Sequence, residues 1–226
     1  MRHKHQAMTQ IYAIGFVAVL LFTFAPAASA FNESDVLTLD IKATVIKGET
    51  IAQIFDRLAS DYDIPIGIEL GDEKLTPRRE INLDLPETNL KDFLDAVIAK
   101  EPRYTWKLEG GVIHVWPVNG RDTLLTALLD TKISHFAIVG EVNRYAVYYD
   151  IMDLPEIRSR LVVAGVEPLT FRGPGSAAKA GKETVFNESN LTLRELLDKI
   201  VLKTEIKQWV ISRWGKNSEF ISLKGG

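Results

Sequence analysis

Residues 89–106 read NLKDFLDAVIAKEPRYTW and residues 192–209 read TLRELLDKIVLKTEIKQW, so one helix-and-strand pattern occurs twice. A shift of 103 with no gap aligns them. The identical pairs are Leu90/Leu193, Leu94/Leu197, Asp95/Asp198, Lys100/Lys203 and Trp106/Trp209. Ordinary composition gives about one chance identity in a window of this length. An internal repeat decides the domain organisation, so we expect two similar small domains in tandem.

The first thirty residues have the features of a secretory signal peptide. Arg2 and Lys4 form a basic start, residues 11–24 are apolar and uncharged, and Ala28-Ser29-Ala30 offers a cleavage site before Phe31. The alternative is a transmembrane anchor, but this run falls short of the roughly 20 residues that span a bilayer. No second apolar stretch follows, so we expect no membrane span after cleavage.

The net charge and the absence of cysteine indicate which class of partner and which compartment the chain has. Removing the signal takes away Arg2 and Lys4 and leaves 25 basic against 30 acidic side chains, a net charge of −5. Nucleic-acid binders normally present a basic face, so this balance argues against that class. The chain has no cysteine. An exported protein without disulfides is more typical of a bacterial periplasm, which is the predicted location, with secretion as the alternative.

The first domain, residues 31–118, is expected to be βαββαββ. Apolar spacing with period two predicts strands, and the i, i+3, i+4 spacing predicts helices. Thr50 and Gln53 form a capping box at the first helix. The expected elements are a strand at 36–46, a helix from Thr50, strands at 64–68 and 80–85, a helix at 90–98, and a hairpin of 103–108 with 112–116. Two helices with one apolar stripe each would cover one face of a small sheet, which is an α+β two-layer sandwich.

The second domain, residues 119–226, is expected to repeat this plan. A helix bridges the two domains, and most later segments match the first domain at the same shift of 103. The expected elements are a bridging helix at 119–131, strands at 133–139 and 145–150, a helix capped by Asp153 and Glu156, a strand at 168–171, a mobile loop at 173–183, a strand at 184–186, a helix capped by Thr192 and Glu195, and a hairpin of 209–212 with 219–223.

The segment at 79–117, REINLDLPETNLKDFLDAVIAKEPRYTWKLEGGVIHVWP, resembles the second half of the STN domain. This is the short N-terminal module of bacterial secretins and TonB-dependent receptors. The resemblance covers residues 37–116 and, more loosely, residues 145–223. It implies a periplasmic protein-contact module of the cell envelope. The chain departs from the family because neither a receptor barrel nor a secretin domain follows, so the resemblance implies no transport or gating.

The sequence offers no constellation that predicts catalysis, a metal or a cofactor, and we expect a protein that is not an enzyme. Beyond the signal only His114 and His135 remain, on different predicted strands, and each is read as a surface or edge histidine. The glycines of 173–183 do not have phosphate-loop spacing. Trp106 and Trp209 occupy equivalent places, so a shared structural role in each core is favoured over a ligand site.

We therefore expect contact with an unidentified envelope protein, with self-assembly also possible, through exposed sheet edges. The predicted contact residues are Val112, Ile113, His114, Val115 and Trp116, with Phe220 and Ile221 as their counterpart. The alternative is a periplasmic protein that binds a small ligand or glycan in a cleft between the domains. The residues predicted to line that cleft are Tyr148, Tyr149 and Trp116.

Overall fold

A computed structural model describes residues 33–72, 78–119, 121–139, 144–168, 184–215 and 220–225. Residues 32–226 form one compact unit. We call residues 33–119 the first half and residues 121–225 the second half. The expected signal peptide and the expected mobile loop at 173–183 lie outside the described residues. Within the described residues, none of the helices combines the length and the apolar character needed to span a membrane.

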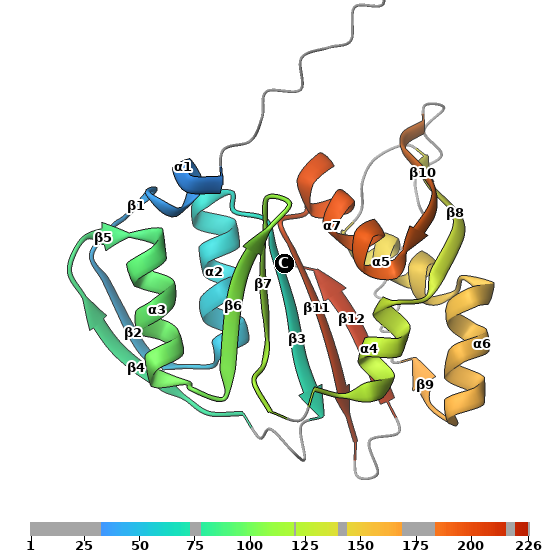
Figure 1. The fold of residues 1–226 in the computed structure, drawn as a ribbon, viewed down its shortest axis with the longest axis horizontal. Coiled ribbons are helices and arrows are strands. Elements are labelled where there is room, and N and C mark those ends of the chain that lie inside the picture. The colour runs from blue at the N-terminus through green and yellow to red at the C-terminus, as the bar shows by residue number, and fades with distance from the viewer. Residues whose placement is uncertain are drawn as a thin grey trace, which may run out of the picture. The chain divides into compact units, whose positions relative to one another are not determined.

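The first half contains three helices and seven strands among its described residues (Figure 1). They are α1 Glu33–Leu37, β1 Asp40–Ile41, β2 Thr44–Glu49, α2 Ile51–Tyr62, β3 Ile66–Asp72, β4 Ile81–Leu85, β5 Thr88–Asn89, α3 Leu90–Lys100, β6 Tyr104–Glu109 and β7 Val112–Pro117. The capping box of Thr50 and Gln53 is confirmed at the start of α2, and the hairpin around Gly110-Gly111 is confirmed as β6–β7.

The single strand predicted at 36–46 is wrong, because α1, β1 and β2 divide it. The chain turns after α1, where the Leu39 amide donates to the carbonyl of Val36 at 3.1 Å. The Thr38 hydroxyl also donates to the carbonyl of Asp35. Threonine side chains compete in this way for backbone partners, and the resulting turn interrupts the alternating pattern.

The second half contains four helices and five strands among its described residues. They are α4 Thr123–Leu129, β8 Lys132–Val139, α5 Arg144–Met152, α6 Pro155–Ala164, β9 Glu167–Pro168, β10 Thr184–Thr192, α7 Leu193–Lys203, β11 Gln208–Trp214 and β12 Phe220–Gly225. The bridging helix, the strand at 133–139, the final hairpin and the capping box of Thr192 and Glu195 are confirmed.

The strand predicted at 145–150 is wrong, because this segment lies in helix α5. Val147, Tyr148, Ile151 and Met152 are buried, and their i, i+1, i+4, i+5 spacing is that of one helix face. The predicted cap of the next helix is also wrong. Proline at the first position starts α6 without a side-chain cap, and Glu156 instead accepts a hydrogen bond from the backbone of Ser134.

One six-stranded sheet joins the two halves in the order β6-β7-β3-β11-β12-β9 (Figure 1). The first half provides β6-β7-β3 and the second half provides β11-β12-β9. In both triplets an antiparallel hairpin is followed by a parallel strand. Each half also has an antiparallel two-stranded ribbon, β2–β4 and β10–β8. The two triplets therefore share one pairing pattern, whereas the segment that corresponds to β2 at the shift of 103 lies in helix α5 and not in β8.

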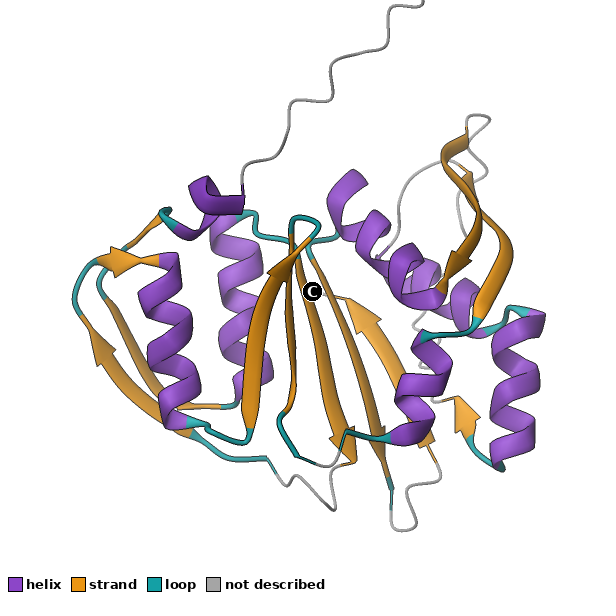
Figure 2. Ribbon diagram, in the orientation of Figure 1, coloured by secondary structure: helices purple, strands orange, loops and turns teal. Residues whose placement is uncertain are grey.

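Helices cover both faces of this sheet where the halves meet (Figure 2). Val210 of β11 packs in the apolar cluster that contains α2 and α3. Its neighbours Trp209 and Ile211 pack in the other cluster, with α7. Successive strand residues point to opposite faces, so the helices of the two halves lie on opposite sides of β11. The chain is an α+β protein, and the two expected domains share one sheet.

Candidate functional site at the seam between the two halves

The two halves meet where β3 pairs in parallel with β11, and we call this pairing the seam. The Ile66 amide donates to the carbonyl of Lys207 at 2.8 Å. Gly67 lies opposite Trp209, whose side chain is fully buried. A β-carbon on Gly67 would lie 2.4 Å from the indole ring, closer than such atoms approach one another. The seam therefore requires glycine at this position.

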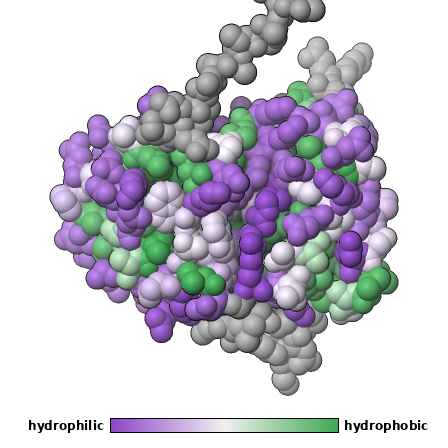
Figure 3. Space-filling view, viewed as in Figure 1, coloured by the Kyte–Doolittle hydropathy of each residue, from purple (hydrophilic) through white to green (hydrophobic). Residues whose placement is uncertain are grey.

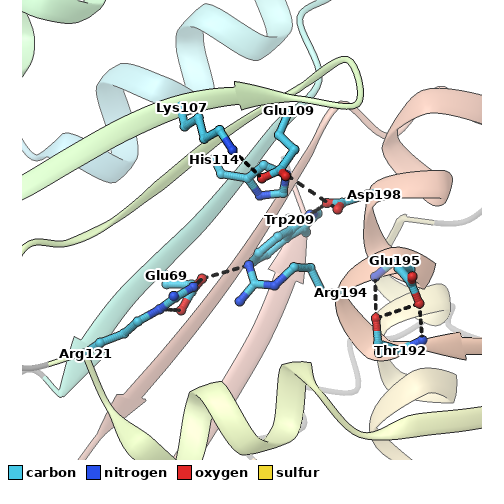
Figure 4. Close-up of polar contacts among 10 residues, drawn as sticks. All are labelled: Glu69, Lys107, Glu109, His114, Arg121, Thr192, Arg194, Glu195, Asp198 and Trp209. Carbon is cyan, nitrogen blue, oxygen red and sulfur yellow. Dashed lines mark hydrogen bonds and ion pairs between the residues drawn. The ribbon is translucent and has the colours of Figure 1, made fainter.

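A buried carboxylate, Glu69 of β3, binds two arginines on the side of the sheet covered by α7 (Figure 4). Arg121 donates two hydrogen bonds to it, one of them 2.9 Å long from Nε to Oε2. Nη1 of Arg194 lies 2.8 Å from Oε1. Burial by itself raises the pKa of Glu69, but the two guanidinium groups outweigh it, so the pKa is lowered. The cluster fixes β3 to α7 and to the segment after β7.

A second polar group at the seam links α7 to both hairpins. The indole Nε1 of Trp209 donates to Oδ1 of Asp198 at 2.9 Å, and Nε2 of His114 lies 3.5 Å from Oδ2 (Figure 4). Burial raises the pKa of Asp198 to about 7 and lowers the pKa of His114 to about 4. Both groups are therefore uncharged between these values. The prediction that His114 is a surface or edge histidine is wrong, because it is buried on an inner strand.

The first half contains the corresponding group in an exposed setting. The indole Nε1 of Trp106 donates to Oδ1 of Asp95 at 2.9 Å, the same bond that Trp209 makes in the second half. Lys91 stands at the position that corresponds to Arg194. Its Nζ lies 2.6 Å from Asp95 on the surface of α3. Burial acts to raise the pKa of Asp95, but Lys91 and Trp106 outweigh it, so this pKa is lowered.

The outer side of β6 is a free sheet edge within the described residues, since β6 pairs only with β7. The Val118 amide donates to the carbonyl of Arg103 at 2.8 Å, which fixes the alternation of hydrogen-bonded pairs along this hairpin. In an antiparallel pair every second residue directs its backbone groups away from the partner strand. The N–H and C=O groups of Trp106 and Leu108 therefore point outward from the sheet.

The matching side of β11 is occupied. Trp209 and Ile211 correspond to Trp106 and Leu108 at the shift of 103, and they lie in the stretch that β3 covers. Trp209 is completely buried, whereas Trp106 is half-buried. The same position in the repeated pattern therefore has a neighbouring strand in the second half and lacks one in the described part of the first.

The predicted open edge at residues 112–116 is wrong. This segment is β7, which pairs with β6 on one side and with β3 on the other. The sequence indicated the hairpin but gave no sign that β3 lies next to β7. Phe220 and Ile221 are likewise paired on both sides, with β11 and β9. Those predicted contact residues that are buried are Val112, Ile113, His114, Val115 and Ile221; Trp116 and Phe220 are half-buried.

The residues predicted to line a ligand cleft do not share one surface. Tyr148 is buried in the core of the second half, and its hydroxyl donates to the carbonyl of Gln208 at 2.9 Å, so its placement in an open cleft is wrong. Tyr149 is half-buried on α5. Trp116 lies on β7, where the guanidinium of Arg121 is 5.7 Å from the ring centre, a cation–π distance.

Glu69, Arg121, Arg194 and Asp198 were not predicted as site residues. The one available signal was a single acid in the apolar segment IGIEL of residues 66–70. Within the described residues no group of three or more His, Cys, Asp and Glu side chains is placed to hold a metal ion. No protein-family model and no curated protein matches the chain.

Proposed function

We propose that the chain is an exported, non-enzymatic protein of the cell envelope that acts by binding another protein along the free edge of β6. The observation that carries this proposal is the contrast between β6 and β11. The two strands have corresponding residues, each forms an antiparallel hairpin with the strand that follows it, and only β11 has its outer side paired within the described residues. An unpaired row of backbone groups is a template for an added strand.

The edge strand itself favours this reading. β6 contains no proline, and its pairing with β7 runs without a register shift. Proline, bulges and charges are the features that natural proteins use to block edge pairing. Lys107 and Glu109 do provide charge, but their side chains lie 3.3 Å apart and partly neutralise one another. The edge is therefore continuous along β6 and able to form hydrogen bonds.

The visible surface argues for contact by backbone pairing rather than through a broad apolar patch. In the view of Figure 3, hydrophobic side chains form small groups separated by hydrophilic ones. The large apolar side chains that are exposed come from several parts of the chain, as Val45, Val118, Val139, Val163 and Val185 illustrate. Large contiguous apolar patches are the usual mark of a hydrophobic docking face.

Export is proposed from the basic start, the apolar run and the small residues of the first thirty positions. The resemblance of residues 37–116 to the STN domain favours the periplasm and a contact role. The acidic balance of the remaining chain favours a protein partner over a nucleic acid. Fractionation of cells that produce the tagged chain tests this part, since the protein should appear in the osmotic-shock fraction.

Site-specific photocrosslinking in the native host tests the contact site. A photoreactive amino acid replaces Lys107 on β6, and the matched control replaces Lys100 at the end of α3; both positions are exposed. We expect a discrete adduct with an envelope protein from position 107 and none from position 100. The proposal fails if neither position forms an adduct or if both form the same adduct.

A further inference from the structure

At the seam, β3 shows which kind of strand pairs with the outer side of β11. The residues of β6 and α3 correspond to those of β11 and α7 that contact β3. Resting on the proposed function, we infer that the β6 edge binds a parallel extended segment of another protein that has glycine opposite Trp106 and an acidic residue two positions later. The β3 segment at the seam has this pattern, Ile66-Gly67-Ile68-Glu69.

The glycine follows from the indole. At the seam Trp209 lies across β3, where a β-carbon on Gly67 would meet it at 2.4 Å. Asp198 holds that indole through a 2.9 Å bond, and Asp95 holds the indole of Trp106 through a bond of the same length. Because the strand position and the bond are the same, the indole of Trp106 projects over the space that a strand beside β6 would fill.

The acidic residue follows from the helix above the strand. Glu69 lies two residues after Gly67 and pairs with Ile211 of β11. Arg194 of α7 binds the Glu69 carboxylate. Lys91 occupies the place of Arg194 on α3, and slightly more than half of its side chain is exposed. A carboxylate opposite Leu108 would therefore lie where Lys91 can turn from Asp95 to bind it.

A foreign segment fits this edge better than a second copy of the chain. The β3 strand of any copy already has neighbours on both sides, β7 and β11. In the second half, the sequence position that corresponds to Gly67 is Thr170. A threonine carries the β-carbon that the indole excludes, so the corresponding segment of a second copy lacks the required glycine.

Fluorescence anisotropy with the full mature chain tests the inference. The probe is a labelled peptide with the sequence of residues 64–71, IPIGIELG, between soluble Gly-Ser linkers. We expect saturable binding that weakens at least tenfold when the peptide glycine is replaced by valine. Absence of saturable binding, or equal binding of the valine peptide, would overturn the inference.

Two protein variants locate the peptide on β6. Trp106→Ala should weaken binding at least fivefold, whereas a peptide that displaced β3 from the seam would be insensitive to this change. A peptide with lysine in place of its glutamate should bind the wild type weakly and regain affinity for Lys91→Glu, with Lys100→Glu as the matched control. Insensitivity to Trp106→Ala, or absence of this charge-swap rescue, would overturn the inference.

The two experiments separate this inference from the function on which it rests. An adduct at position 107 without peptide binding would leave β6 as the contact site and show that the segment pattern is wrong. Loss of both the adduct and the peptide binding would remove the proposed contact site itself.

Discussion

The two Asp–Trp pairs, Asp95–Trp106 and Asp198–Trp209, show how one local pattern acquires different properties from its surroundings. Both pairs join a helix to the first strand of a hairpin through a 2.9 Å bond from indole to carboxylate. The carboxylate of Asp95 lies at the surface and has a lowered pKa, whereas Asp198 is partly buried beside His114 and has a raised pKa. The local sequence is enough to form each Asp–Trp pair. The burial of the second pair depends on β3, which pairs with β11 at the seam.

The comparison also explains why the halves hold together. In the second half the cation on the helix, Arg194, reaches across to Glu69 of the first half. In the first half the corresponding Lys91 binds its own helix at Asp95. The same helix position therefore carries a cation that joins the two halves in one case and a cation that stays at the protein surface in the other. Substitutions at the seam, each with a control at the surface of the first half, test this difference.

The largest effect is expected at Gly67. Gly67→Val places side-chain atoms within the indole of Trp209, so β3 and β11 must separate or Trp209 must leave its site. We expect the free energy of unfolding to fall by about 3 kcal/mol or more, the cost of severe overpacking. Urea denaturation measures the change. Thr105→Val on β6, which has no strand beyond it in the described residues, is the control and should change stability by less than about 0.5 kcal/mol.

Removal of the buried charge should have the next largest effect. Glu69→Gln leaves Arg121 and Arg194 facing a neutral group inside the seam. Loss of one partner of a buried ion pair is costly, so we expect about 2–3 kcal/mol lower stability. The control is Glu109→Gln, an exposed acid on β6. Equal effects of the two changes would show that the seam cluster does not hold the halves together.

A pH-dependent difference should separate the two aspartates. The pKa of Asp198 is raised from 3.8 to about 7 in the folded chain, so its stabilising contribution is complete below about pH 4 and is lost as the pH rises through 7. Between pH 5.5 and 7.5, the wild type should therefore lose about 2 kcal/mol relative to Asp198→Asn. His114 titrates in both proteins, so its contribution largely cancels in this comparison.

Asp95→Asn is the matched control for that experiment. The pKa of Asp95 is lowered, so its contribution is present above its ordinary value and is lost only in acid. The difference between the wild type and Asp95→Asn should stay constant from pH 5.5 to 7.5. Thermal unfolding in a pH series gives both comparisons, and a constant difference for Asp198→Asn would contradict the raised pKa of that carboxyl.

Local patterns in the sequence predicted most of the elements, because they are decided by neighbouring residues. The helices around Leu90 and Leu193, two of the three predicted capping boxes and the hairpin at Gly110-Gly111 follow from apolar spacing and turn chemistry. The segment 145–150 failed because six residues are too few to separate period two from a helix face. Its helical burial shows only when Ile151 and Met152 are included.

The seam was beyond sequence reasoning because it depends on contacts between distant residues. Ile66 and Gln208 pair across more than a hundred positions of the chain, and apolar alternation does not specify which strand edges meet. Glu69 lies in a segment with strand character. Its carboxylate can be buried because Arg121 and Arg194, which are distant in the sequence, bind it. The predicted contact residues are wrong for the same reason. The order of the strands in the sheet decides which edge is free, and the sequence does not specify that order.

The most direct test of the central claim is amide hydrogen exchange of the isolated chain, residue by residue, in the two hairpins. We expect the amides of Trp106 and Leu108 to exchange orders of magnitude faster than those of Trp209 and Ile211, because only the second pair faces a neighbouring strand. Equal and strong protection of all four amides would show that the β6 edge is already covered, and would contradict the proposed contact site.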